Sequence, residues 1–246
     1  MTYFSRVLIN TQSWRARRAL ASRERLHAII ARAVSDASPV RPAVSDMPPS
    51  FGERKGEGGH LWRLDSGHGS HGACLYIVSS IVPDSGILLD QLGSSARDVA
   101  TSEYEPFLER LSLGQEWGFR LCANPTQSHR SDTPGLRGTR TGIVLEKDQI
   151  AWLDRQGRRC GFHMTINRMD APEVVIRESR IISFARQRST VTLSSVAYDG
   201  ILAIDDPESL RHALLTGIGR GKRYGFGLLT LVPIPGRTFP DEVPRA

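Results

Sequence analysis

The sequence predicts an α+β fold, because short apolar stretches of strand length alternate with segments of helical periodicity. The order is strand–helix–strand–strand–helix–strand in the N-terminal half, and a strand-rich version of that order follows a polar stretch. This βαββαβ order is that of a ferredoxin-like unit. We therefore expect two tandem ferredoxin-like domains, the second of them modified and carrying a basic β-hairpin.

The first strand is expected over residues 3–10 (YFSRVLIN), which are apolar and partly β-branched. Ser22 is a suitable N-cap for the helix that follows. That helix carries one apolar stripe, formed by Leu26, Ile29, Ile30, Ala33 and Val34. The stripe indicates the face of the helix that packs on a sheet.

The rest of the first domain is expected to be mainly strands. Residues 61–64 and 74–80 have the composition of a hairpin, and a weakly periodic stretch at 86–111 is expected to hold a short helix. Residues 117–123 (WGFRLCA) are expected to form the closing strand, which Asn124 and Pro125 end.

The second domain is expected to begin with a helix that contains residues 150–153 and ends near Arg159. Residues 161–166 and 174–184 resemble strands, and 191–198 is expected to pair back on the latter. The remaining expected elements are a turn at Asp199-Gly200, a strand at 201–204, a helix from Pro207 to Leu214 and a closing strand at 226–232.

Composition sets the expected domain limits. Residues 36–59 are rich in Ser, Pro, Gly and charge and are expected to form a long loop. Residues 127–141 are polar and are expected to link two domains at 1–126 and 142–246.

The charge distribution favours a phosphate-bearing partner. Lys and Arg number 32 against 26 acids, for a net charge of +6, and the pI is about 9.6. Residues 1–35 hold seven arginines against the single acid Glu24, and such clustering is typical of proteins that bind nucleic acid. Arginine suits bidentate contacts to phosphate and guanine, although a GC-rich genome produces the same bias.

The cysteines and the hydropathy exclude several classes of protein. Cys74, Cys122 and Cys160 are widely spaced and contain no C-x-x-C pair, which predicts neither a disulfide framework nor a structural zinc site. We expect a reducing, cytoplasmic location. No run of 18 apolar residues is present, so no membrane span or membrane partner is expected.

A glycine-rich segment at 217–229 (GIGRGKRYGFGLL) is the most informative motif. Glycines at alternating or near-alternating positions permit positive φ, and freed amides beside Arg220, Lys222 and Arg223 make a concavity suited to phosphate oxygens. The G-x-x-x-x-G-K-[ST] order is missing, and the segment runs from a helix into a strand, which argues against a nucleotide-binding loop. The alternative is a flexible loop with solvated cations.

Seven sequence features in order resemble the CasE family, the type I-E CRISPR-associated endoribonucleases that process CRISPR repeat RNA. They are Ser5-Arg6 with Asn10, Arg17-Arg18-Ala19-Leu20 before a helix with His27, Leu61-Trp62-Arg63, Phe119–Pro125, Trp152-Leu153 with Gly161-Phe162, Tyr198-Asp199-Gly200 and the glycine-rich segment. The resemblance implies two ferredoxin-like domains that bind a repeat stem-loop. It also implies one cut at the 3′ base of the stem without metal or another cofactor, a 2′,3′-cyclic phosphate product, and retention in the Cascade complex with its other subunits.

The resemblance places the catalytic histidine at His27. This residue lies about 100° around the helix from Leu26 and so borders the buried stripe. Histidine suits proton transfer because its unperturbed pKa is near 6.5. The alternative is a histidine at the rim of the core that only forms local hydrogen bonds.

Two other positions on that helix bear on the chemistry. Glu24 stands where some family members have a tyrosine, and it can either orient His27 or act as a first-turn acid favouring the helix dipole. Arg32 stands where the family has a lysine proposed to stabilise the transition state. It lies about 140° from His27, so we expect an RNA contact first and a catalytic contact second.

The implied RNA-binding residues form three groups. They are Arg17 and Arg18, the hairpin arginines Arg177, Arg180, Arg186 and Arg188, and the loop residues Gly219, Arg220, Gly221, Lys222 and Arg223. The resemblance places a basic hairpin in the RNA major groove, where guanidinium groups can bind guanine O6 and N7. The alternative for the hairpin is an edge strand that charge protects from aggregation.

Some residues mimic sites. His60, His68 and His71 suggest a metal site but lie in a Gly/Ser-rich loop without a carboxylate pattern, so we assign them no ligand role. Asp205 and Asp206 are expected at a helix N-terminus. Trp62 and Trp117 are expected in the core, with base stacking as the alternative.

The sequence thus predicts a repeat-specific, metal-independent endoribonuclease. Because the tyrosine is missing, a catalytically impaired repeat-RNA-binding subunit is the alternative. A nucleotide-dependent enzyme is disfavoured by the order of elements around the glycine-rich segment.

Overall fold

The structure is a computed structural model and describes residues 1–35, 60–67, 72–129, 139–186 and 189–234. The chain divides into two compact units. Unit 1 contains residues 1–60 and 64–105, and unit 2 contains residues 61–63 and 106–246. The long loop expected at 36–59 lies outside the described residues.

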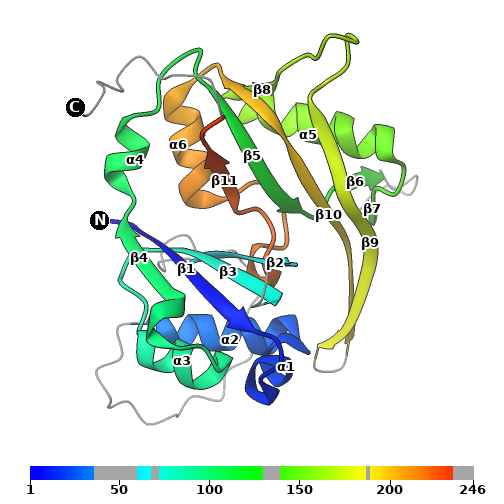
Figure 1. Ribbon diagram of the computed structural model, residues 1–246. Helices are drawn as coiled ribbons and strands as arrows, with labels where there is room; N and C mark the ends of the chain where they lie inside the picture. Colours follow the sequence, from blue (N-terminus) through cyan, green and yellow to red (C-terminus); the bar gives the residue numbers. More distant parts are fainter. Residues whose placement is uncertain (36–59, 68–71, 130–138, 187–188, 235–246) are drawn as a thin grey trace, which may run out of the picture. The chain divides into compact units, whose positions relative to one another are not determined.

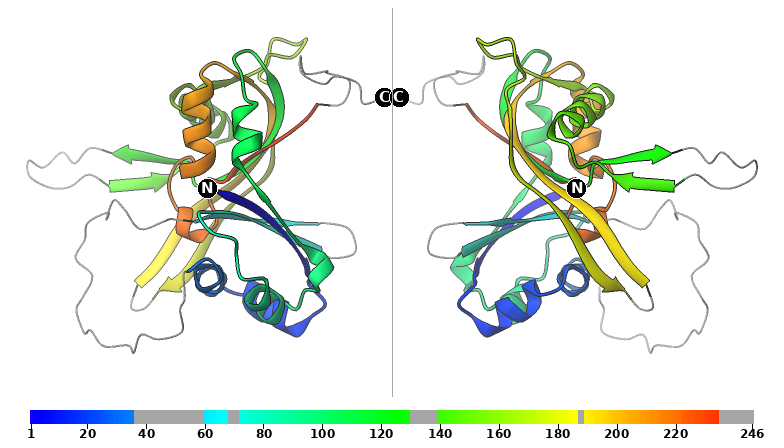
Figure 2. Two further views of the ribbon diagram at one scale, coloured as in Figure 1. Left: turned by 90° about the vertical axis from the view of Figure 1, so that its left-hand side faces the viewer. Right: turned by 90° about the vertical axis from the view of Figure 1, so that its right-hand side faces the viewer.

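Unit 1 contains most of a four-stranded sheet of order β2-β3-β1-β4, in which β1 pairs antiparallel with β3 and with β4, while residues 61–63 of β2 belong to unit 2. Its strands are β1 (Tyr3–Asn10), β2 (Leu61–Ser66), β3 (Gly72–Ser79) and β4 (Val99–Glu103). Its helices are α1 (Trp14–Leu20), α2 (Arg23–Ala33), α3 (Ser85–Leu92) and a 3₁₀ helix, Ala96–Asp98. Figures 1 and 2 show α1, α2 and α3 together on one face of the sheet.

The core of unit 1 follows from the alternation of its strands. In β1, Ser5, Val7 and Ile9 are buried, whereas Arg6 and Asn10 between and beyond them are exposed. The expected stripe of α2 is confirmed, because four of its five members, Leu26, Ile29, Ile30 and Ala33, are buried. Successive residues of a strand face opposite sides of a sheet, so the side of β1 that carries these buried residues is the side that can pack against the helices.

Unit 2 contains a five-stranded sheet with the path β11-β5-β10-β8, and β9 also pairs with β10. Its strands are β5 (Glu116–Ala123), β8 (Phe162–Met164), β9 (Val174–Arg186), β10 (Ser189–Ile204) and β11 (Leu229–Val232). Its helices are α4 (Glu105–Glu109, which begins at the last residue of unit 1), α5 (Glu146–Arg159), α6 (Pro207–Thr216) and a 3₁₀ helix, Lys222–Tyr224. Figure 2 shows α5 and α6 on one face of this sheet.

The expected helix near 150–159, the helix from Pro207 and the pairing of β9 with β10 are confirmed. The first helix carries buried Trp152 and Leu153, and the Trp152 ring stacks on the buried Tyr198 of β10 with centroids 6.5 Å apart. Asp206 caps α6 by accepting hydrogen bonds from the backbone of Glu208 and Ser209.

The closing strand that the sequence predicts for the first domain needs correction. The strand at 117–123 exists as β5, but it pairs with β10 and β11 in unit 2. The strand that pairs with β1 in unit 1 is β4. Its sequence, VATSE, is almost wholly exposed and lacks alternation, so its pattern gave no signal. The first compact unit ends at residue 105, whereas the sequence predicts a first domain of residues 1–126.

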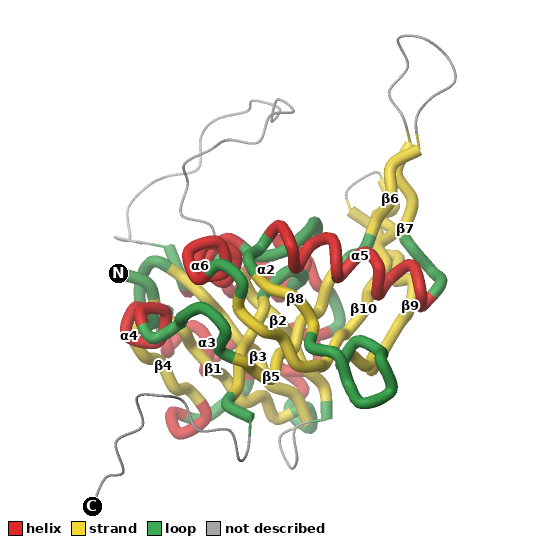
Figure 3. Tube along the Cα trace, turned by 90° about the horizontal axis from the view of Figure 1, so that it is seen from above, coloured by secondary structure: helices red, strands yellow, loops and turns green. Residues whose placement is uncertain are grey.

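The described part of the expected linker at 127–141 contains two paired strands, and the assignment of the segment as a linker stays a prediction. Strands β6 (Thr126–His129) and β7 (Thr139–Gly142) pair antiparallel over these residues, and Figure 3 shows the two strands side by side. Both are short and mostly exposed. Because the side chains on both faces of such a ribbon are polar, its sequence shows no alternation of apolar and polar residues.

The turn expected at Asp199-Gly200 is absent from the described strand, because β10 continues through it. Asp199 lies opposite Arg120 of β5 and accepts two hydrogen bonds of 2.6 Å from its guanidinium group. A Cβ at Gly200 would lie 2.3 Å from the carbonyl oxygen of Glu173 and 2.8 Å from the Phe119 ring. Glycine is used here for close approach and not for a turn.

Among the described residues, no helix combines the length and the apolar character needed to cross a membrane.

The packing of Gly225 gives a test of this fold. Its φ is +81°, and a Cβ there would lie 2.5 Å from the buried Trp62 ring. Gly225→Ala is expected to lower the free energy of unfolding by about 2–5 kcal/mol, because backbone strain and overpacking add. Urea unfolding followed by circular dichroism measures the change.

Gly114→Ala is the matched control. Gly114 has φ +78°, but a Cβ added there would have nothing within 4 Å. This variant is expected to lose only the backbone part, about 1–2 kcal/mol. Equal losses in the two variants would contradict the close contact with Trp62.

Candidate functional site

Helix α2 positions the candidate catalytic histidine. Ser22 is its N-cap, and the Ser22 hydroxyl accepts a hydrogen bond from the backbone N–H of Arg25 at 3.4 Å, as the sequence predicts. His27 is half-buried, between the buried Leu26 on one side and the exposed Ala28 on the other. The residue therefore lies at the rim of the core.

His60 is the residue that the structure places beside His27. Its Nε2 lies 3.3 Å from His27 Nδ1, within hydrogen-bond distance, and the two rings stack at 23° with centroids 5.1 Å apart. Burial and, next, the neighbouring His27 lower the pKa of His60 from 6.5 to about 4. His60 is consequently neutral near pH 7.

The sequence assigned His60 to a group of histidines without a role. His68 and His71 lie outside the described residues, and His60 immediately precedes the buried residues Leu61 and Trp62 of β2. Its position directly before a buried strand was the available sequence signal for His60, because the backbone next to such a strand is held in a fixed place. Among the described residues, no three His, Cys, Asp or Glu side chains gather as a metal site would require.

Glu24 lies in the first turn of α2 and is exposed. Among the described residues, no hydrogen bond or ion pair joins Glu24 to His27. Its place in the first turn agrees with a favourable interaction with the helix dipole. An effect of Glu24 on His27 stays a prediction.

Arg32 lies on another face of α2 from His27. The helix remains regular to Ala33, and five residues at 100° each separate the two side chains by about 140°. Arg32 lines a surface pocket of about 430 Å³. The other cationic residues of this pocket are Arg15, Arg18 and Arg25.

This arginine pocket is only partly neutralised. Arg15 forms a 3.0 Å ion pair with Asp90, and Arg25 donates to the Arg18 carbonyl oxygen at 2.9 Å. Trp14, 60% exposed, also lines the pocket. Arg17 and Arg18 are both exposed on α1. A pocket with several guanidinium groups and an exposed indole can accept phosphate oxygens and a base, which supports RNA contacts and leaves the catalytic assignment of Arg32 a prediction.

The glycine-rich segment has the backbone that the sequence predicts. Gly217, Gly219, Gly221, Gly225 and Gly227 all have positive φ. The segment is nevertheless packed, because Ile218, Tyr224 and Phe226 within it are buried. Its glycines also make room for neighbours, since a Cβ at Gly219 would lie 3.0 Å from the Trp152 ring. The alternative of a flexible loop therefore does not fit.

The cations of this segment lie at its surface. Arg220 and Arg223 are exposed, and Lys222 is half-buried. Arg220 forms an isolated backbone bridge with Asn124, the residue after β5. The bridge fixes the backbone from which the Arg220 side chain extends.

The long β9–β10 ribbon carries the predicted hairpin arginines. Arg177 is 3.1 Å from Asp199, and Arg180 is 3.0 Å from Glu178, with all these side chains at least partly exposed. Arg186 ends β9, although its side chain is not described, and Arg188 lies outside the described residues. The structure thus places Arg177 and Arg180 on one strand but does not describe how the other two are arranged.

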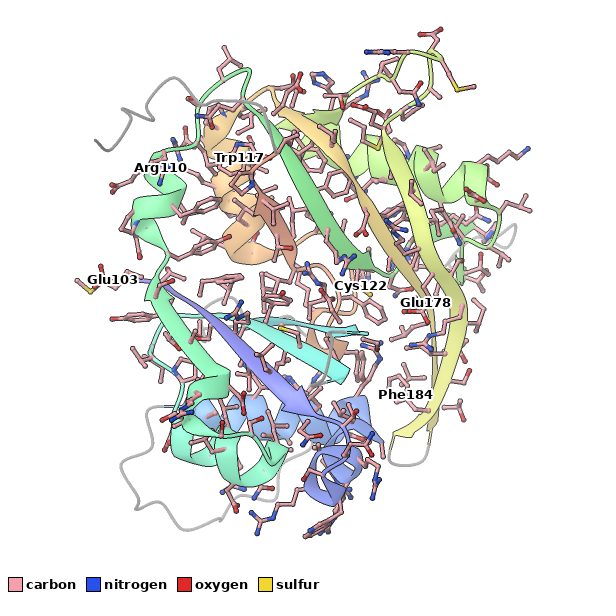
Figure 4. All side chains as sticks on the ribbon, in the orientation of Figure 1. Glu103, Arg110, Trp117, Cys122, Glu178 and Phe184 are labelled. Atoms are coloured by element: carbon pink, nitrogen blue, oxygen red, sulfur yellow. The ribbon has the colours of Figure 1, made fainter. Side chains whose placement is uncertain are left out.

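The ribbon and the glycine-rich segment meet in unit 2. The Phe184 ring packs edge-on against the buried Tyr224, with centroids 4.9 Å apart. Figure 4 shows Phe184 towards the far end of β9 and Glu178 nearer its middle. Two elements that are far apart in the sequence, and that both carry predicted RNA-binding cations, are therefore held together.

Asp199 organises charge at the base of the ribbon. Partial burial acts to raise the pKa of Asp199, but the hydrogen bonds and charges of Arg120, and then Arg177, outweigh it and hold this pKa below its usual value. Asp199 is thus ionised at neutral pH and holds Arg177 in place.

Other predicted assignments outside the site are confirmed. Trp62 and Trp117 are buried in the core. Asp206 is the N-cap of α6, and the adjacent Asp205 pairs with His163 at 2.8 Å.

Comparison with known proteins finds similarity along nearly the whole chain. The sequence model of a family described as CRISPR associated protein matches residues 2–233. The CRISPR-associated endoribonuclease Cse3 of Thermus thermophilus is 25% identical over 237 residues, which are 94% of this chain and 100% of that protein. The CRISPR system Cascade subunit CasE of Escherichia coli is 30% identical over 131 residues, which are 51% of this chain and 62% of that protein.

Solved structures agree with these sequence matches. Thermus thermophilus Cse3, bound to an RNA representing a pre-cleavage complex, has a TM-score of 0.73 at 26% identity, covering 94% of this chain and 99% of that one. Cas6e from Escherichia coli has a TM-score of 0.54 at 22% identity, covering 94% and 100%. The second likeness concerns the fold alone.

The pKa of His60 predicts a pH dependence of stability. Between about pH 6.5 and pH 4 the unfolded chain binds a proton at His60 that the folded protein does not. The free energy of unfolding therefore decreases as the pH falls through this window. In His60→Phe this decrease should be smaller than in the wild type, as urea unfolding at pH 7.5 and 5 can measure. His212→Phe, at an exposed position on α6, is the control, and a wild-type pH dependence in His60→Phe would contradict the assignment.

Proposed function

The chain belongs to the family of CRISPR associated proteins, and on that premise we propose that it is an endoribonuclease that processes CRISPR repeat RNA. The observation that carries this proposal is the match over 94% of the chain to Cse3, a named endoribonuclease whose structure contains RNA. The second relative is a named Cascade subunit, which supports the other Cascade subunits as partners.

The finer architecture proposed is two tandem ferredoxin-like units. Unit 1 has the βαββαβ order and the sheet order β2-β3-β1-β4. Unit 2 is a modified unit in which the β9–β10 ribbon extends beyond the residues of β10 that pair with β5. In this proposal the ribbon and the packed glycine-rich segment bind the stem of a repeat hairpin.

The reaction proposed is attack of a ribose 2′-oxygen on the adjacent phosphorus at the 3′ base of the stem. The 2′-OH loses its proton, the P–O5′ bond breaks, and the 5′-oxygen gains a proton. The products are a 2′,3′-cyclic phosphate and a 5′-hydroxyl, so the step consumes no water, and it is proposed to need no metal. Alignment of the 2′-oxygen and charge balance on the phosphorane supply much of the acceleration.

His27 is the residue proposed to transfer protons in this step. A half-buried imidazole at the rim of the core can meet a phosphodiester, and imidazole is the side chain suited to gaining and losing a proton near neutral pH. The exposed arginines of α1 and α2 supply positive charge to the RNA backbone. The product stays bound because a tight RNA complex dissociates slowly.

Replacing His27 tests the catalytic assignment. With a labelled repeat hairpin in EDTA, the wild type should cut at one position. His27→Ala should cut at least about 100-fold more slowly, because a general acid or base is lost, while its Kd for the hairpin changes little. Tight binding by the wild type without cleavage would instead identify an RNA-holding subunit, and a requirement for metal would contradict the proposed chemistry.

Replacing Arg220 tests the binding assignment. Arg220→Gln should weaken binding and lower the slope of log Kd against log salt by about 0.7–0.9, the value for one lost phosphate contact. The matched control is Arg155→Gln, since Arg155 is exposed on α5 outside the ribbon and the glycine-rich segment. Equal effects of the two changes would show that only net charge matters.

A further inference from the structure

We propose that His60 is a positioning residue for His27: it accepts a hydrogen bond from His27 Nδ1–H, so that His27 presents its Nε2 to the RNA. The inference rests on the proposed function and deepens it by assigning a second histidine to the same site. It starts from the Nε2–Nδ1 separation of 3.3 Å and the near-parallel rings.

The hydrogen bond requires one ring to donate and the other to accept. A neutral imidazole has one N–H and one free nitrogen, and an imidazolium has two N–H groups. His60 is held neutral by burial and by its neighbour, with a pKa of about 4, so it retains a free nitrogen for His27 across the range in which RNA cleavage is measured. When His60 accepts at Nε2, the His27 proton must lie on Nδ1.

This arrangement fixes the chemistry of the other His27 nitrogen. In the neutral state Nε2 carries no proton and can accept the 2′-OH proton, and in the protonated state Nε2–H can donate to the 5′-oxygen. An acceptor on Nδ1–H holds the imidazole in one tautomer and favours its protonated form, because both N–H groups are then used. Without His60 the ring could place its single proton on either nitrogen, and a fraction of the molecules would present the wrong one.

The described charged residues of α2 within about one turn before His27 are Arg23, Glu24 and Arg25. Glu24 is exposed and makes no hydrogen bond or ion pair with His27 in the described part of the chain. From the described segment that leads into β2, His60 is a titratable group that stands against the ring. The effect of His60 on His27 can therefore be tested separately from that of Glu24.

Two variants separate the acceptor from the ring. His60→Phe keeps an aromatic ring to stack on His27 but has no nitrogen. His60→Gln places an amide oxygen close to the position of the imidazole Nε2 and restores an acceptor. The matched control is His212→Phe, at its exposed position on α6. Circular dichroism and urea unfolding confirm that each variant is folded at the assay temperature.

Single-turnover cleavage of the labelled repeat hairpin in EDTA, at saturating protein, measures the chemical step. His60→Phe should be slower by about 10- to 100-fold, the usual cost of removing the partner that orients a functional histidine, while Kd stays unchanged. The limb of the pH–rate profile that reports His27 should move to lower pH, because the protonated ring has lost its acceptor. His60→Gln should recover most of the rate, and His212→Phe should match the wild type.

A second measurement does not depend on cleavage. In protein labelled with ¹⁵N-histidine, nitrogen chemical shifts should show neutral His27 protonated at Nδ1 in the wild type and as a mixture of tautomers in His60→Phe. A wild-type His27 protonated at Nε2 overturns the inference. So does a His60→Phe variant with unchanged rate and pH profile, or one that loses only RNA affinity. If the wild type never cleaves, the proposed function fails, and the tautomer measurement still decides the role of His60.

Discussion

The rotational setting of α2 is the constraint on which the candidate site depends. Leu26, Ile29 and Ile30 are all buried, and burial of each such side chain stabilises the fold by about 1.5–3 kcal/mol. Because these side chains fix which face of the helix is inside, they also fix where the residue after Leu26 lies. His27 is consequently half-buried at the rim, within hydrogen-bond distance of His60. The same geometry directs Arg32 elsewhere, into the arginine pocket.

In the second unit, glycines fix the backbone of the glycine-rich segment in a comparable way. Positive φ at alternating positions folds the 217–227 segment tightly, and the missing Cβ atoms let the Trp62 and Trp152 rings approach. Phe184 then packs on Tyr224 and joins this segment to the β9–β10 ribbon. Cations that extend from a packed backbone lose less conformational entropy on binding than cations on a mobile loop. The basic residues are therefore presented from a largely prearranged surface.

Charge is balanced differently at three places in the molecule. Around Asp199 the guanidinium groups of Arg120 and Arg177 are paired with a carboxylate, which holds the ribbon but reduces its net attraction for phosphate. In the arginine pocket of unit 1, one Asp faces four arginines, so much of the positive charge remains for a ligand. At the histidine pair, His60 is neutral near pH 7, so a charge there requires a proton on His27, as the proposed proton transfer does.

The sequence by itself determined the elements whose signals are local. The cap and stripe of α2, the helices α5 and α6, strand β1 and the β9–β10 pair were predicted from periodicity and capping residues, and the positive φ values followed from the glycines. Only the tertiary structure decided the partners: β4 instead of β5 beside β1, the polar β6–β7 pair, and His60 beside His27. Periodicity reports the environment along one element, whereas sheet pairing and a contact across 33 residues depend on the path of the chain between them, which no local pattern encodes.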